Sequence, residues 1–153
     1  MGVDDFRRLL GDMRLVALDT MVFVYHLANH PRYSALTTAV LEAVEVGRLI
    51  GVTTTVTLAE ILTAPAKTGD RQAFQDYELY LTRFPNLRIA PLDVALARET
   101  ALVRGATGLR TPDAVQVAAA RLASADAIIT NDRRWAGRVD QPAVVMLEDY
   151  ASL

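Results

Sequence analysis

The chain has 153 residues, a length that favours one domain with a single hydrophobic core. Its 16 basic and 18 acidic residues give a net charge of −2, which excludes a strongly polybasic nucleic-acid binder but not a local basic patch. The sequence contains no cysteine, so disulfides, thiolate catalysis and cysteine-type zinc sites are excluded. The longest apolar runs fall far short of the ~20 residues that span a bilayer, and no secretory signal is recognised. We therefore expect a cytoplasmic protein with no membrane association.

Residues 1–13 are expected to form a helical extension at the N-terminus. Phe6, Leu9 and Leu10 recur at the three- and four-residue spacing of one helix face. Met13 lies directly before the first expected strand, so the chain could start at Met1 or at Met13. We treat residues 1–13 as an optional flank and residues 14–153 as the domain.

Beyond this flank, short apolar segments alternate with longer amphipathic ones. The expected strands are residues 15–18, 49–52, 87–90, 127–130 and 144–147, and helices are expected near residues 20–29, 34–46, 55–64, 70–84, 93–104 and 111–123. Pro65 is expected to shorten the helix that contains Glu60, and Thr53 to Thr55 are expected to form a turn or cap. Strands that alternate with helices of ten or more residues imply right-handed crossovers. The predicted fold class is a three-layer α/β/α domain around a parallel sheet of four or five strands.

Four acidic residues are placed where this fold would bring them together. Asp19 follows the first strand, and Asp132 follows the strand near the C-terminus. Glu60 lies in the helix after the second strand, and Asp113 lies in the first turn of the helix before the fourth. In open α/β sheets the chemistry gathers outside the carboxyl ends of the strands. We therefore expect these four carboxylates at one rim of the sheet.

Carboxylates that crowd together repel one another and partly protonate unless a cation neutralises them. Mg²⁺ is the natural occupant, because it is a hard ion that takes carboxylate and phosphate oxygens. Such an ion can activate a water molecule and stabilise charge on a phosphate. The predicted chemistry is metal-dependent phosphodiester hydrolysis.

Four segments carry a resemblance to a known family: Asp19-Thr20, Leu58-Ala59-Glu60, Thr111-Pro112-Asp113-Ala114 and Ala125 to Asp132. Over residues 14–150 the chain resembles the PIN domain, in particular VapC-type toxins. The resemblance implies a PIN-like sheet in the order 3-2-1-4-5. It also implies an Mg²⁺- or Mn²⁺-dependent ribonuclease that cuts single-stranded regions of RNA. Such proteins are commonly toxins of type II toxin–antitoxin pairs, with a cognate antitoxin protein as partner, and they are often homodimers.

The resemblance also assigns roles to individual residues. The catalytic and metal-binding acids would be Asp19, Glu60, Asp113 and Asp132, with Thr20, Thr130 and Asn131 in support. Arg133 and Arg134, next to the last acid, are the best candidates for RNA phosphate contacts, although a solvated turn explains them almost as well. Asp126 starts its strand and should lie at the opposite edge of the sheet, so it is excluded from the site.

Each of the four acids also has a structural explanation. Asp113 would favour any helix through the macrodipole, and Asp19 could cap the helix that follows it. Glu60 could be solvated, and Asp132 could shape a turn. A non-catalytic PIN-fold module that binds RNA or protein therefore stays open as the alternative function. A phosphoacceptor receiver domain is disfavoured, because it needs a lysine after the last strand and Lys67 lies in mid-chain.

Overall fold

The computed structural model describes residues 2–152 and contains a parallel sheet of five strands. The strands are β1 (Leu15–Leu18), β2 (Ile50–Thr54), β3 (Leu87–Ala90), β4 (Ala127–Thr130) and β5 (Ala143–Met146). Their order is β3-β2-β1-β4-β5, with every neighbouring pair parallel. Val16 of the central strand lies opposite Gly51 on one side and Ala127 on the other. The predicted fold class and strand order are both confirmed.

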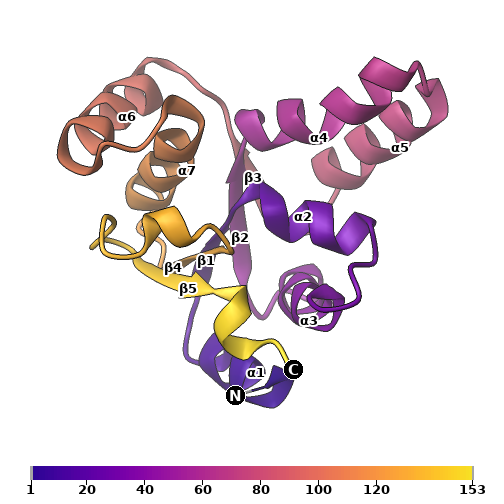
Figure 1. Ribbon diagram of the computed structural model, residues 1–153, viewed down its shortest axis with the longest axis horizontal. Helices are drawn as coiled ribbons and strands as arrows, with labels where there is room; N and C mark the ends of the chain where they lie inside the picture. Colours follow the sequence, from indigo (N-terminus) through magenta and orange to yellow (C-terminus); the bar gives the residue numbers. More distant parts are fainter. Residues whose placement is uncertain (1, 153) are drawn as a thin grey trace.

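Helices cover both faces of the sheet (Figure 1). The helices are α1 (Val3–Gly11), α2 (Thr20–Leu27), α3 (Ser34–Glu45), α4 (Thr55–Thr68), α5 (Arg71–Thr82), α6 (Val94–Thr107) and α7 (Thr111–Leu122), with short 3-10 turns η1 (Arg133–Trp135) and η2 (Leu147–Tyr150). The helices α6 and α7 lie on one side, and α2 to α5 lie on the other. Among residues 2–152 no helix is long and apolar enough to cross a membrane.

The central strands are buried on both faces, and their side chains alternate between two hydrophobic clusters. Val16 and Leu18 of β1 belong to the cluster beneath α1, α2 and α3, whereas Ala17 belongs to the cluster beneath α6 and α7. In β4, Ile129 and Ile128 divide between the same two clusters. Burial on both faces explains why these strands are continuous apolar runs in the sequence.

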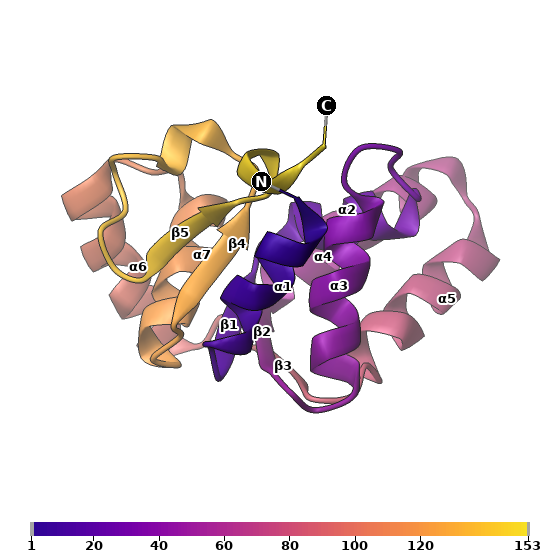
Figure 2. The ribbon, with the colours of Figure 1, turned by 90° about the horizontal axis from the view of Figure 1, so that it is seen from below.

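The N-terminal helix is part of the core, in contrast to the optional flank expected for residues 1–13. Phe6 is 0% exposed and Leu10 is 4% exposed, and both lie in the same hydrophobic cluster as Val16. The ring of Phe6 lies 5.3 Å from the ring of Tyr150, centroid to centroid. Figure 2 shows α1 lying beside α3 and across the sheet. Met1, one of the two candidate starts, lies outside the described residues.

Two strands, β2 and β5, have bounds that differ from the expected ones. β2 begins at Ile50 and extends to Thr54, so Thr53 and Thr54 are paired with β3 rather than forming a turn, and Thr54 is also the N-cap residue of α4. Both threonines are buried, and their hydroxyls have hydrogen-bond partners inside the protein, which makes burial of these polar side chains possible. β5 begins and ends one residue earlier than expected, and Leu147 starts η2.

Pro65 does not shorten the helix after Glu60, and that prediction is wrong. α4 continues through Pro65 to Thr68, and its C-cap is Gly69, whose φ of +70° is in the left-handed region that favours glycine. A proline inside a helix removes one backbone donor, but the ring of Pro65 is buried on the same face as Ile61, one turn earlier. Burial of the ring offsets the lost hydrogen bond, and glycine ends the helix instead.

The packing of α1 predicts that Phe6→Ala lowers the free energy of unfolding by about 3–5 kcal/mol, the usual cost of removing a buried phenylalanine ring. Chemical denaturation would measure this. Arg7→Ala is the matched control, because the Arg7 side chain is 58% exposed and its removal should change stability by less than about 0.5 kcal/mol. Equal stabilities for Phe6→Ala and Arg7→Ala would show that α1 is a dispensable flank.

Candidate active site

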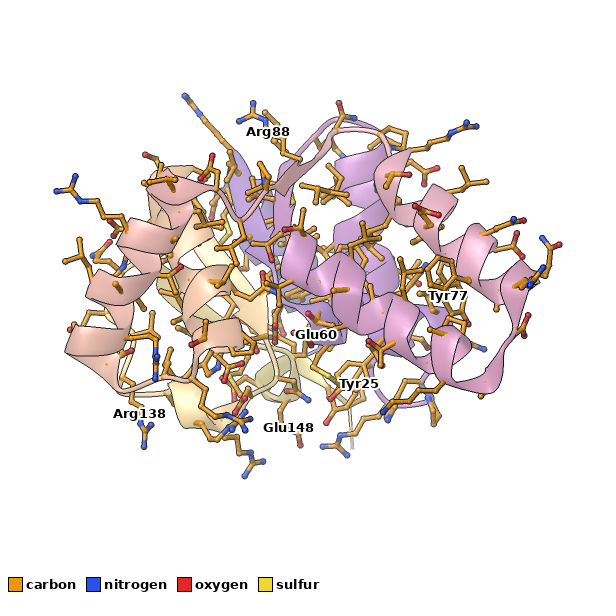
Figure 3. The ribbon with its side chains drawn as sticks, turned by 90° about the horizontal axis from the view of Figure 1, so that it is seen from above. Tyr25, Glu60, Tyr77, Arg88, Arg138 and Glu148 are labelled. Carbon is orange, nitrogen blue, oxygen red and sulfur yellow. The ribbon has the colours of Figure 1, made fainter. Side chains whose placement is uncertain are left out.

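The four predicted acids come together at the carboxyl edge of the sheet. Asp19, Glu60, Asp113 and Asp132 all line one cavity of about 410 Å³. The rest of the lining consists of Thr20, Met21, Arg110, Pro112, Gln116 and Arg134. Figure 3 shows Glu60 near the centre of this side of the molecule. Residues separated by more than a hundred positions in the sequence are therefore neighbours in one cavity.

Local structure explains how each acid reaches the cavity. Asp19 is the N-cap of α2, directly after β1, and Asp132 is the N-cap of η1, two residues after β4. Glu60 lies in the second turn of α4, and Asp113 lies in the first turn of α7. The helices α2, α4 and α7 all begin at this edge and contact one another in the pairs α2–α4 and α4–α7. Their N-terminal ends carry partial positive charge, which favours anions in the cavity.

Asp19 is the most deeply buried of the four acids, with 7% of its surface exposed. One carboxylate oxygen accepts a hydrogen bond from the backbone N–H of Thr20 (2.8 Å), and the other accepts one from the hydroxyl of Thr130 (2.8 Å). Burial raises the pKa of Asp19 from its ordinary 3.8 to about 6. The two hydrogen bonds oppose this rise in pKa, while the negative charges of Asp113 and Glu60 add to it.

Of the other three acids, Glu60 and Asp113 have raised pKa values, whereas Asp132 has a lowered one. Burial raises the pKa of Glu60 and of Asp113, and like charge adds to both: Asp113 acts on Glu60, and Asp132 acts on Asp113. The guanidinium of Arg134 lowers the pKa of Asp132 by hydrogen bonding. The cavity is therefore acidic and crowded, and it is only partly neutralised by the protein itself.

Two cationic side chains, Arg110 and Arg134, line this cavity, and Arg134 forms ion pairs with its acids. Its Nε donates to both carboxylate oxygens of Asp132, at 2.9 and 3.0 Å, and its Nη2 lies 3.6 Å from a carboxylate oxygen of Asp113. The Arg134 side chain is 54% exposed, so its guanidinium can also extend into solvent. The guanidinium thus bridges two of the four acids across the cavity.

The donor set of the cavity suits a hard divalent cation. It consists of carboxylate oxygens, with neither cysteine nor histidine in the lining, which matches the ligand preference of Mg²⁺ and Mn²⁺. In residues 2–152 no three acidic or histidine side chains stand in metal-binding geometry as placed, and two of the carboxylates are turned towards Arg134. The chemistry of the residues therefore fits such an ion, and binding would displace the guanidinium from Asp132 or Asp113.

Two of the three predicted supporting residues contact the acids. Thr130 donates to Asp19 and accepts from the backbone N–H of Asp132 (3.1 Å), so its hydroxyl joins two of the acid-bearing segments. Thr20 is buried in the cavity wall and contacts Asp19 through its backbone N–H, whereas its hydroxyl is bonded to Thr57 and Gln116. Asn131 is turned away from the cavity, because its amide donates to the Tyr25 hydroxyl (3.3 Å) and accepts from the backbone N–H of residue 148 (2.9 Å).

The remaining sequence expectations concern residues around this site. Arg133 is exposed but does not line the cavity, whereas Arg134 does. Asp126 lies at the opposite edge, as expected, and accepts hydrogen bonds from the backbone N–H groups of Arg14 and Leu15. Trp135 is fully buried and packs in the core.

Sequence reasoning missed two polar residues that line the cavity, Gln116 and Arg110. Gln116 is a single large polar residue among the buried alanine and valine residues of α7, one turn after Asp113. A polar side chain on an otherwise apolar and buried helix face is a signal that could have been noticed. Arg110 precedes α7 as its N-cap residue, and no pattern in the sequence distinguished it from the other arginines.

Comparison with protein families identifies the domain. The family model described as the PIN domain matches residues 16–140 of this chain. The chain belongs to the PIN domain family. No sequence among curated proteins is significantly similar to it. The matched segment of the PIN domain contains all four acids of the cavity and excludes α1.

Solved structures show the same PIN fold. A toxin–antitoxin complex from Klebsiella pneumoniae contains a chain with a TM-score of 0.66 and 20% identity; the match covers 86% of this chain and 97% of that one. A chain of VapBC2 from Rickettsia felis, bound to a promoter DNA fragment, has a TM-score of 0.65 and 17% identity, and the match covers 86% of this chain and 98% of that one. A chain of FitAcB from Neisseria gonorrhoeae has a TM-score of 0.63 and 20% identity, and the match covers 87% of this chain and 98% of that one. The PIN domain here has nearly the full extent of those chains.

The raised pKa of Asp19 predicts a pH-dependent stability difference between the metal-free wild type and Asp19→Asn. The unfolded chain loses this proton near pH 3.8 and the folded protein near pH 6, so ionisation of Asp19 destabilises the fold as the pH rises through this window. The shift corresponds to at most about 3 kcal/mol. Urea denaturation in EDTA should show Asp19→Asn gaining stability relative to wild type between pH 4 and pH 7.

Asp126→Asn is the matched control, because backbone hydrogen bonds lower the pKa of Asp126. Its ionised form is favoured in the folded protein, so this variant should lose stability relative to wild type as the pH rises through the ordinary range of aspartate. Parallel pH profiles for Asp19→Asn and wild type would contradict the assignment of Asp19 as the acid with the raised pKa.

Proposed function

We propose that the protein is an Mg²⁺- or Mn²⁺-dependent endoribonuclease that cleaves single-stranded regions of RNA and acts as the toxin of a type II toxin–antitoxin pair. The observation that carries this proposal is the convergence of four carboxylates, from four separate elements of a PIN domain, in one cavity. Structural helix caps and solvated surface acids need no common cavity. A shared site for a divalent cation explains why all four lie together.

The residues of the cavity would have different roles in binding the ion. Asp19, Glu60, Asp113 and Asp132 would hold the ion, which when bound stabilises charge on a phosphate and provides a nucleophilic water at neutral pH. The hydroxyl of Thr130 fixes the orientation of the Asp19 carboxylate, so this ligand is held in place before the ion arrives.

Arginines at the rim would bind the RNA backbone. Arg134 lies in the cavity lining, and Arg133 is exposed beside it, so both can reach phosphate oxygens. Arg110 lines the same cavity, at the start of α7. Arg134, which is hydrogen-bonded to Asp132 in this structure, would provide a planar guanidinium for a phosphate group of the RNA.

The proposed partners follow from the kind of structures that share this fold. The chains from K. pneumoniae and R. felis come from a toxin–antitoxin complex and from VapBC2. We propose that this chain likewise pairs with a cognate antitoxin protein, whose basic side chains would complement the acidic cavity. We further propose that it forms a homodimer and acts in the cytoplasm.

The nuclease proposal predicts that the purified protein cleaves single-stranded RNA with Mg²⁺ or Mn²⁺ and that EDTA abolishes the cleavage. Asp19→Asn should lower the rate by more than about 100-fold, because even the loss of an outer-shell partner of a metal ligand typically costs 10–100-fold. Asp126→Asn, the same chemical change at the opposite edge of the sheet, should cleave like wild type. Gel-based cleavage of a labelled oligoribonucleotide would measure all three proteins.

Metal-independent cleavage, or full activity of Asp19→Asn, would rule out this mechanism. RNA binding without cleavage across several metals would instead support a non-catalytic PIN-fold module. The toxin role has its own test: induced expression should arrest growth, and Asp132→Asn should relieve the arrest. Growth arrest that persists in Asp132→Asn would show that toxicity does not depend on the acids of the cavity.

A further inference from the structure

The guanidinium of Arg134 lies between two acids of the cavity and is paired with both. Its Nε donates hydrogen bonds to both carboxylate oxygens of Asp132, at 2.9 and 3.0 Å. Its Nη2 donates to Asp132 as well and lies 3.6 Å from a carboxylate oxygen of Asp113. In the free protein, a cationic side chain of the chain itself therefore engages both oxygens of Asp132 and one oxygen of Asp113.

Arg110 provides a comparison within the same cavity. It also lines the cavity, and its positive charge acts from a distance to lower the pKa of Asp113 and of Asp132. Among residues 2–152, however, the ion pairs of these two acids are formed with Arg134 and not with Arg110. A change at Arg110 thus alters the charge of the cavity without breaking an ion pair of its acids.

The contact with the guanidinium can be broken without displacing the Asp132 carboxylate. One oxygen of Asp132 also accepts a hydrogen bond from the backbone N–H of residue 134 (2.9 Å), since Asp132 is the N-cap of η1. The backbone N–H of Asp132 is itself held by the Thr130 hydroxyl (3.1 Å). The Arg134 side chain, by contrast, is half-exposed and has solvent to move into. The arginine side chain can therefore leave while the acid stays in place.

Both ligands of the proposed nuclease favour the arginine away from the acids. A divalent cation would take the carboxylate oxygens that the guanidinium engages in this structure, and two positive charges at one carboxylate repel each other. A phosphate group of the RNA is the alternative partner of the guanidinium, because it accepts the same forked pair of hydrogen bonds as a carboxylate. Two ligands that favour the same state of a protein increase each other's affinity.

We propose that Arg134 couples the two ligands: its guanidinium pairs with Asp132 and Asp113 in the free protein and with a phosphate group of the RNA in the complex, so a divalent cation and the RNA each bind more tightly in the presence of the other. The inference rests on the proposed function, because it assigns the acids to the cation and Arg134 to the RNA. It adds a regulation of the site: the protein without RNA holds the cation weakly, and the RNA strengthens that binding.

Calorimetric titration of the whole metal-free protein with Mn²⁺, without RNA, tests the competition between Arg134 and the cation. Arg134→Met keeps a long side chain but removes the guanidinium, so it should tighten Mn²⁺ binding by about 5-fold or more, within the usual range of coupling between ligands. Arg110→Met is the matched control, since it removes the same charge from the same cavity and breaks no ion pair of the described acids. It should tighten Mn²⁺ binding by only about 2-fold, the effect of a more distant charge that water screens.

The competition between the acids and the RNA is tested in EDTA, by the fluorescence anisotropy of a labelled single-stranded oligoribonucleotide. Asp132→Asn removes the charge that holds the guanidinium, and it should tighten RNA binding by about 5-fold more in the protein with Arg134 than in Arg134→Met. Asp19→Asn is the control: above pH 6 it also removes a negative charge, but the Asp19 carboxylate is bonded to Thr20 and Thr130 instead. The effect of Asp19→Asn should be equal with and without Arg134.

Equal gains in Mn²⁺ affinity for Arg134→Met and Arg110→Met would overturn the coupling, because the charge of the cavity would then explain both gains. An equal effect of Asp132→Asn on RNA binding with and without Arg134 would also overturn it. RNA cleavage by the wild type together with either of these results would leave the nuclease proposal intact. If both binding experiments give the expected results but the wild type cleaves no RNA, the nuclease proposal is overturned and the coupling remains.

Discussion

Repulsion between carboxylates that share one cavity is the constraint around which this domain is arranged. Asp19 is buried and flanked by other negative charges, so its ionised form is costly. The protein offsets that cost locally with a threonine hydroxyl, a backbone N–H group and the positive ends of three helices. The arginine of η1 neutralises a second acid, Asp132. The negative charge of the cavity is therefore only partly neutralised, and a divalent cation that bound there would relieve the remaining repulsion.

The acids of the cavity differ in how firmly neighbouring groups fix their side chains. Asp19 belongs to the end of the central strand, and both of its oxygens are engaged by neighbouring elements. Asp132 lies on a short turn, and its arginine partner is half-exposed. Glu60 reaches the cavity from the second turn of α4, and its residue is exposed. The rigid acid lies deepest, and the adjustable ones lie at the rim, where a substrate would enter.

Much of this arrangement could be predicted from the sequence. Apolar runs that end in an acid identified β1 and β4 and placed Asp19 and Asp132 at one edge, because all strands of a parallel sheet end on the same side. Local patterns could not show that Thr53 and Thr54 extend β2, since their polar hydroxyls are paired only by residues far away in the chain. Pro65 was misjudged for a similar reason, because burial of its ring depends on tertiary packing. The polar side chain of Gln116 on the apolar face of α7 was a visible signal, but its three hydroxyl partners were not, because they lie on other elements far away in the chain.

The packing of α1 brings the two ends of the described chain together. The rings of Phe6 and Tyr150 contact each other at an angle of 50°, so the first helix and the last turn occupy the same part of the surface. Figure 2 brings α1 to the front, whereas Figure 3, from the opposite side, brings α4 and Glu60 to the front. Any segment that precedes residue 2 or follows residue 152 would leave the molecule near this aromatic contact. A fused protein or a purification tag at one terminus would accordingly lie close to the other terminus.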